Sequence, residues 1–192
     1  MSRNTREDVV VAAGRMFATH GYDATSMREL GRELGLLGSS LYSHIGSKQD
    51  LLVEVVHRGA ALFQASADAS LDAGAGRARL RALIAGHIGV VLDHRDEVQT
   101  FLNEARALDA THRAQVLHER NTYEQAFRNA IGAGGTDGSI IDAERDPKTT
   151  ASFVLSILNA VDRWYSDTGP LSRDQLVDEI MAFAGLWEGA EQ

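Results

Sequence analysis

The chain has 192 residues, with 19 Lys and Arg against 27 Asp and Glu, so its formal net charge is -8. An acidic excess of this size argues at first sight against a nucleic-acid partner, because phosphate binding needs a cationic surface. Cysteine is absent, which excludes disulfide scaffolds, thiolate zinc sites and cysteine nucleophiles. No apolar run approaches the ~20 residues of a membrane span, so we expect a cytoplasmic protein with no membrane partner.

Apolar residues recur at helical spacing along almost the whole chain, and no segment alternates with the period of two that a strand requires. The pattern predicts an all-α fold of about nine helices. The expected helices cover residues 5–20, 25–35, 38–44, 47–65, 77–93, 96–108, 110–133, 147–166 and 172–188. Residues 65–76 and the glycine-rich stretch 134–138 are expected to contain loops. We expect two domains, at residues 1–47 and 48–192.

The first three expected helices have the lengths and spacing of a helix-turn-helix module over residues 5–45. Gly35 supplies the turn, and Gly31 lets the two short helices approach closely. The side chains left at the tip are mainly hydroxyl, aromatic and basic groups, which donate hydrogen bonds to phosphates and base edges. The sequence therefore predicts that this segment binds DNA.

The same segment resembles the DNA-binding region of the TetR family of transcriptional repressors. The resemblance is carried by Gly21-Tyr22, Thr25 to Leu30, Gly35-Leu36, Ser40-Leu41-Tyr42, His44 and Ser47 to Leu52. The DNA contacts that it implies are Thr25, Ser26, Arg28, Leu37, Gly38, Ser39, Ser40, Tyr42, His44 and Lys48. Residues 38–44 then form the recognition helix in the major groove, and residues 37–40 read the base sequence. Thr25 or Ser26 caps the preceding helix and both touch phosphate.

A second resemblance covers later segments. Asn103 to Arg106 and Leu158 to Tyr165, followed by Gly169 to Ser172, are similar to the subgroup of that family that controls fatty-acid and steroid-ring degradation and responds to acyl-CoA thioesters. This resemblance implies a small-molecule effector whose phosphates are held by arginines. The candidate ligand-binding residues are Phe101, Arg106, Arg113, Arg120, Asn159 and Trp164. Core packing of the aromatic residues and solvation or salt bridging of the arginines are the alternative interpretations.

The last two expected helices carry more apolar surface than a terminal helix pair needs, which predicts a homodimer. The candidate interface residues are Phe153, Ile157, Val161, Leu176, Ile180, Phe183 and Trp187. A dimer presents two recognition helices to a near-palindromic DNA operator, about one helical turn apart. An effector that moves the long helix beginning at Lys48 then takes them out of register.

Other classes of function remain as alternatives. Glu54 and His57 form a Glu-x-x-His motif that Asp109 and His112 echo, as in di-iron helical bundles, so a helical-bundle metal protein or enzyme is one alternative. Such a site needs two good copies and two further glutamates, and we favour no metal and no cofactor. A pure interaction module, or a repressor that responds to a drug-like effector, are the others. We favour a DNA-binding repressor that is not an enzyme.

The charge is unevenly divided along the chain. Residues 1–58 carry seven basic and seven acidic side chains, whereas the rest carries 12 basic and 20 acidic ones. The whole acidic excess therefore lies outside the predicted DNA-binding segment, and Arg3, Arg6, Arg28 and Lys48 are expected to face DNA.

Overall fold

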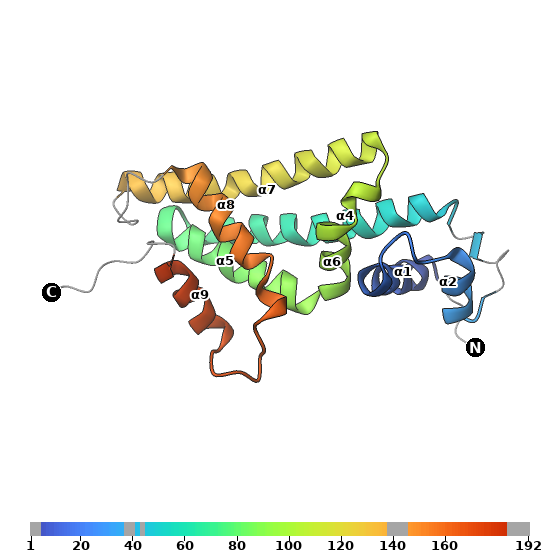
Figure 1. The fold of residues 1–192 in the computed structure, drawn as a ribbon. Coiled ribbons are helices and arrows are strands. Elements are labelled where there is room, and N and C mark those ends of the chain that lie inside the picture. The colour runs from blue at the N-terminus through green and yellow to red at the C-terminus, as the bar shows by residue number, and fades with distance from the viewer. Residues whose placement is uncertain (1–4, 37–40, 43–44, 138–145, 184–192) are drawn as a thin grey trace. The chain divides into compact units, whose positions relative to one another are not determined.

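The computed structural model describes residues 5–36, 41–42, 45–137 and 146–183 (Figure 1). This described part is helical and contains no strand, as the sequence predicts. Its α-helices are α1 (Arg6–His20), α2 (Met27–Glu33), α4 (Lys48–Ala69), α5 (Gly76–Asp93), α6 (Arg95–Asn103), α7 (Ala110–Asp137), α8 (Pro147–Leu158) and α9 (Arg173–Phe183). Three short 3-10 helices are η1 (Ser70–Ala73), η2 (Ala105–Ala107) and η3 (Val161–Arg163). None of the described helices is long and apolar enough to cross a membrane.

The chain packs as two compact units, and each is built from separated stretches of sequence. Unit 1 combines Met1–Ala61 with His94–Glu119, and unit 2 combines Leu62–Asp93 with Arg120–Gln192. Residues 94–119 therefore pack with the N-terminal helices. The functional division at residues 47 and 48 stays a prediction, because these are units of packing.

The helices of unit 1 begin and end where side chains satisfy the free backbone groups of the helix termini. Thr5 and Asp8 form a reciprocal capping box at the start of α1. Gly21 ends α1 with a φ of 84°, a conformation that favours glycine, and its N–H donates to the carbonyl of Phe17. Ser47 caps α4 by accepting a hydrogen bond from the backbone N–H of Asp50 at 3.0 Å.

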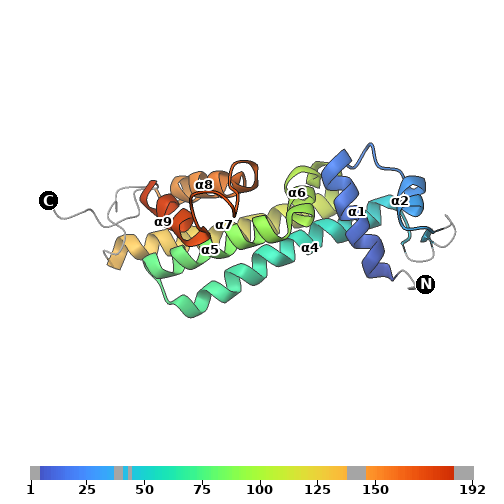
Figure 2. The same ribbon diagram turned by 90° about the horizontal axis from the view of Figure 1, so that it is seen from below.

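The core of unit 1 forms where α1 packs against α2 and α6, which lie beside it in both views (Figures 1 and 2). Its fully buried side chains include Val9, Ala13, Phe17, Leu30, Leu41, Leu51, Leu52, Val55 and Val98. One buried polar group joins two of these helices, since the Thr100 hydroxyl of α6 donates to the carbonyl of Gly14 in α1 at 3.3 Å.

In unit 2, α5 packs against α8, α9, η1 and η3. Asp146 caps α8 and Pro147 occupies its first turn, as the sequence predicts for this punctuation. Arg173 at the start of α9 binds the carboxylates of both Asp93 and Asp167, at 2.8 Å each. These contacts fix α9 against the end of α5.

Three expected helix ends are wrong. α4 continues to Ala69, and α7 continues through the glycines at 132–135 to Asp137, where a loop was expected. Glycine weakens a helix by about 1 kcal/mol per residue, but packing of the helix outweighs so small a preference. α8 ends at Leu158, so residues 159–166 do not extend it. Most of the expected helix at 38–44 lies outside the described residues, and Leu41 and Tyr42 within it are helical.

Gly59 marks the closest approach between α4 and α6. A Cβ atom at this position would lie 2.7 Å from the Cβ of Phe101 and 2.9 Å from the carbonyl oxygen of Glu97. We expect Gly59→Ala to lower the free energy of unfolding by about 1–3 kcal/mol, because the backbone must shift to relieve the overlap. Gly89→Ala in α5 is the control, since its nearest non-local atom is 3.9 Å away. Urea unfolding measures both, and equal effects of the two substitutions would contradict the packing argument.

Candidate DNA interface and sensor core

The turn between α1 and α2 is held by hydroxyl groups. Ser26 is the N-cap of α2, accepting from the N–H of Glu29 at 3.2 Å, while its own hydroxyl donates to the Glu29 carboxylate at 2.7 Å. These hydrogen bonds hold the pKa of Glu29 below its usual range. The expectation that the Thr25 hydroxyl touches phosphate is wrong, because this side chain is 3% exposed and donates to the carbonyl of Gly21 at 2.9 Å. Thr25 fixes the turn instead.

Tyr42 is the most exposed aromatic side chain of the expected DNA-binding segment in the described part. Its side chain is 54% exposed, while Leu41 and Ile45 on either side of it are buried. Arg28 on α2 is exposed as well. The expected contacts Leu37, Gly38, Ser39, Ser40 and His44 lie outside the described residues.

Lys48 lies at the first position of α4 and is positioned by a tyrosine that the sequence analysis did not single out. The Lys48 ammonium is 4.0 Å from the centroid of the Tyr22 ring. The Tyr22 hydroxyl donates to the side chain of Gln49 at 3.0 Å, and the Gln49 amide donates to the carbonyl of Ala107 at 3.4 Å. Tyr22 therefore ties the end of α1 to the start of α4. An aromatic residue directly after the glycine that ends a helix was the available signal.

Several cations of unit 1 are matched within the unit. Arg6 contacts Glu54 at 2.7 Å, so the expectation that Arg6 faces DNA as an unmatched charge is wrong. Arg15 pairs with Glu33 and Arg58 with Glu7. Within residues 5–61 as described, Arg28, Arg32 and Lys48 have no ion pair. Arg3 lies outside the described residues.

Unit 2 contains an aromatic cluster, which we call the sensor core and define as Phe63, His87, Tyr123, Phe127 and Asn159. The Phe63 ring lies 4.7 Å from the His87 ring and 5.3 Å from the Tyr123 ring, measured between centroids. Nδ1 of His87 is 3.1 Å from the Tyr123 hydroxyl oxygen. Burial lowers the pKa of His87 to about 3, against a smaller opposing effect of Asn159, and burial also raises the pKa of Tyr123. Both side chains are therefore neutral near pH 7.

The sequence analysis named one member of this cluster, Asn159, among its ligand-binding candidates. His87 and Tyr123 escaped notice because single polar residues on apolar helix faces look like ordinary core positions. The other candidates are distributed over the two units. Phe101 is 6% exposed and packs where α6 meets α4, so it is a core residue of unit 1, and Arg106 and Arg113 are exposed in the same unit. In unit 2, Arg120 is half-buried, which lowers its pKa, and Trp164 is 56% exposed.

The expected dimer interface divides into buried and exposed side chains. Val161, Leu176 and Ile180 are at most 4% exposed within unit 2, so their assignment to an interface is wrong: they form its own core. Phe153 on α8 and Phe183 on α9 are 66% and 79% exposed. Ile157 is half-buried, and Trp187 lies outside the described residues.

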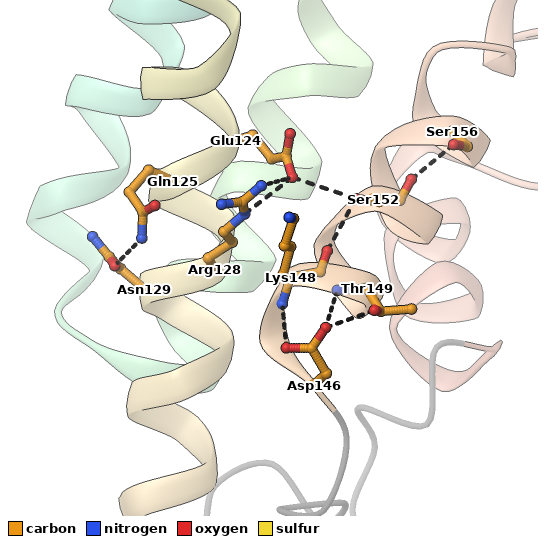
Figure 3. Close-up of polar contacts among 9 residues, drawn as sticks. All are labelled: Glu124, Gln125, Arg128, Asn129, Asp146, Lys148, Thr149, Ser152 and Ser156. Carbon is orange, nitrogen blue, oxygen red and sulfur yellow. Dashed lines mark hydrogen bonds and ion pairs between the residues drawn. The ribbon is translucent and has the colours of Figure 1, made fainter.

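Polar contacts join α7 and α8 near the exposed Phe153 (Figure 3). The Glu124 carboxylate accepts hydrogen bonds from Arg128 one turn later on α7 and from the Ser152 hydroxyl of α8, the latter at 3.3 Å. Asp146 caps α8 by accepting from the N–H and hydroxyl groups of Thr149. These contacts fix the orientation of α8 within unit 2.

The two Glu-x-x-His-like motifs are occupied by other contacts. Glu54 binds Arg6, and Nδ1 of His57 is 3.3 Å from the Glu119 carboxylate. Asp109 and His112 bind each other at the start of α7. Among the described residues, no three His, Asp or Glu side chains gather in a way that suits a metal ion.

A helix-turn-helix segment joined to a second, entirely helical part defines a class of transcriptional regulators that bind DNA and are not enzymes. Residues 9–55 match the family described as "Bacterial regulatory proteins, tetR family", and residues 73–185 match the family described as "Tetracyclin repressor-like, C-terminal domain". The chain belongs to the TetR family of transcriptional regulators.

Curated relatives and solved structures extend this comparison. The chain is 25% identical over 179 residues to the HTH-type transcriptional repressor KstR2 of Mycobacterium tuberculosis, covering 92% of this chain and 89% of that protein. It is 26% identical over 183 residues to KstR2 of Rhodococcus jostii, covering 92% and 87%. AibR in complex with isovaleryl coenzyme A and operator DNA shares the fold, with a TM-score of 0.84 at 24% identity over 95% of this chain and 99% of that one.

The buried histidine makes the stability of unit 2 depend on pH. Folded His87 stays neutral down to about pH 3, whereas in the unfolded chain it takes up a proton near its ordinary pKa of 6.5. Between these values the unfolded state binds more protons, so stability is lost as the pH falls through this window. We expect the free energy of unfolding to fall by up to about 1.4 kcal/mol per pH unit more in the wild type than in His87→Phe.

Urea unfolding between pH 7 and pH 4 measures this difference. His118→Phe, which replaces an exposed histidine on α7, is the control and should follow the wild-type curve. A His87→Phe curve parallel to that of the wild type would show that His87 does not titrate as its burial requires.

Proposed function

We propose that the chain is a cytoplasmic repressor that binds a near-palindromic operator as a homodimer and is released by a small-molecule effector. The observation that carries this proposal is the combination of exposed Tyr42 with the unmatched cations Arg28 and Lys48 on one small unit. These groups suit phosphates and base edges, and family membership supports the same assignment. Residues 37–40, together with His44, complete the proposed recognition surface, and Ser26 adds its backbone N–H to phosphate.

The acyl-CoA thioester is the effector class that we propose. Two relatives listed above are named KstR2 repressors, and the AibR structure contains isovaleryl coenzyme A. Arg106, Arg113 and Arg120 are the proposed phosphate-binding side chains, because guanidinium groups pair with phosphate oxygens in a bidentate manner. Asn159 is the proposed contact to the acyl part, and Trp164 is a further candidate.

DNA binding is tested with the upstream region of the protein's own gene by fluorescence anisotropy at several salt concentrations. We expect Tyr42→Ala with Lys48→Ala to weaken binding by about tenfold or more and to reduce the salt dependence by about one phosphate contact. Arg15→Ala is the control, since Glu33 already neutralises this arginine. Unchanged binding by a double variant that unfolds like the wild type would contradict the assignment.

Dimer formation is tested through the two exposed phenylalanines. We expect Phe153→Asp with Phe183→Asp to shift the protein toward monomer in sedimentation velocity, because a charged group buried at an interface without a partner is strongly unfavourable. Leu71→Asp on η1 is the control, as Leu71 is 55% exposed in the same unit. A wild type that sediments as a monomer, or a dimer unaffected by both substitutions, would contradict this interface.

The effector class is tested by thermal shift with isovaleryl coenzyme A and with unacylated coenzyme A. A ligand at a hundred times its dissociation constant adds about 2.7 kcal/mol to stability, which raises the midpoint by several degrees. We expect the thioester to raise the midpoint more than coenzyme A does. Free branched-chain acid and a cationic drug are the comparison ligands, and a shift with these alone would assign a different effector class.

A further inference from the structure

The sensor core holds polar atoms whose hydrogen bonding is incomplete. Nε2 of His87 is buried and has no hydrogen-bond partner in the described part of the chain, and Ser66 Oγ of α4 is in the same condition. A buried donor or acceptor left unsatisfied typically destabilises a protein by about 1–3 kcal/mol, and such groups in native structures call for a bound partner. His87 is 1% exposed, so bulk solvent does not supply this partner in the structure as it stands.

The hydrogen bond at the other ring nitrogen determines what His87 can offer. If the Tyr123 hydroxyl donates to Nδ1, as a neutral tyrosine can, the ring proton lies on Nε2. Nε2 is then a donor aimed at an acceptor atom that the described residues do not provide. Asn159 lies beside the ring and carries an amide that can donate to the same acceptor.

The surroundings of His87 restrict the charge of that acceptor. The rings of Phe63, Tyr123 and Phe127 lie within 6.4 Å of the imidazole ring, between centroids. The imidazole and the phenol are both neutral, so the cluster contains no cation to balance a carboxylate and no anion to balance an amine. Bringing an unbalanced charge into such surroundings is far more unfavourable than bringing in a neutral dipole.

We propose that His87 and Tyr123 form the polar anchor of the effector site and bind a neutral carbonyl oxygen carried on an apolar group, with Asn159 as the second donor. This inference rests on the proposed effector-responsive function and specifies its site and ligand chemistry. An acyl thioester and a ketone present the same oxygen, whereas free acids and amines of the same size are rejected. The acyl end of a CoA thioester fits this description and its phosphates do not.

The test uses the full-length protein with 15N-labelled histidine, and the ring-nitrogen NMR signals are followed without DNA. The probes are isovaleryl coenzyme A, 2-octanone, octanoate and octylamine. We expect the Nε2 signal of His87 to move with the thioester or the ketone and to stay in place with the acid and the amine. A signal that responds to the ketone alone identifies a ketone effector, and one that responds to the thioester alone identifies an acyl-CoA.

Tyr123→Phe removes the hydroxyl and keeps the ring, and we expect it to weaken binding of the carbonyl probe by about tenfold. Tyr165→Phe is the matched control, because the Tyr165 hydroxyl donates to the carbonyl of Leu171 elsewhere in unit 2. The wild-type NMR signals decide the question even where a variant fails to fold. The proposal is overturned if no probe moves the His87 signal, leaving only a water at Nε2, or if octanoate moves it as strongly as 2-octanone.

Operator binding separates this inference from the proposed function. If isovaleryl coenzyme A releases the operator while His87 does not respond, the site is overturned and the repressor function stands. If a carbonyl probe binds at His87 but the protein has no operator, the site stands and the proposed function falls.

Discussion

The close packing of α6 against α1 and α4 is the contact on which the DNA-binding part of this protein depends. Gly59 lets the α4 backbone approach Phe101 and Glu97 more closely than any side chain would permit. Thr100 adds a buried hydrogen bond to the Gly14 carbonyl of α1. Because packed interiors do not deform continuously, a displacement of α6 must be followed by α1 or must break this contact. Residues 94–119 thus belong mechanically to the DNA-binding helices.

Tyr22 carries the same constraint to the start of α4. Its ring holds the Lys48 ammonium, and its hydroxyl reaches Gln49, whose amide meets the backbone of η2 at Ala107. η2 directly follows α6, so a movement of α6 reaches the proposed DNA contact at Lys48 through two hydrogen bonds and one aromatic contact. This gives effector control a physical route within unit 1. The route acts by changing the position of α1 and Lys48 and leaves the chemistry of the DNA-contacting groups unchanged.

Local signals in the sequence were sufficient for the fold class and for most helix starts. Thr5, Ser26, Ser47 and Asp146 cap their helices by short-range hydrogen bonds, which depend on a few neighbouring residues and can be read from them. The extension of α7 through its glycines was missed because packing outweighs intrinsic preference there. Apolar periodicity also gave no means of deciding whether Val161, Leu176 and Ile180 face the core of their own unit or a second copy.

The candidate site followed the same division. Tyr42 and Arg28 were identified because the helix-turn-helix frame places them at the tip, whereas Thr25 was misassigned because a hydroxyl looks the same in sequence whether it donates to phosphate or to a carbonyl. The sensor core was missed because Phe63, His87 and Tyr123 come from three helices far apart in the chain. Contacts of this kind depend on tertiary packing, which a single sequence does not encode in any local pattern.

The charge distribution determines how sensitive such a regulator is to small movements. Three arginines of unit 1 are neutralised by carboxylates of the same unit, so few cations remain for phosphate, and the acidic excess of the rest of the chain opposes non-specific binding. Binding at one half-site is then weak, and tight binding requires two half-sites engaged together. When affinity depends on simultaneous engagement, a shift of the recognition helices that hardly affects one half-site removes most of the gain from the second. A weak half-site is therefore what allows a modest displacement of α1 to release the operator, and an effector needs only to favour the displaced arrangement over the DNA-bound one.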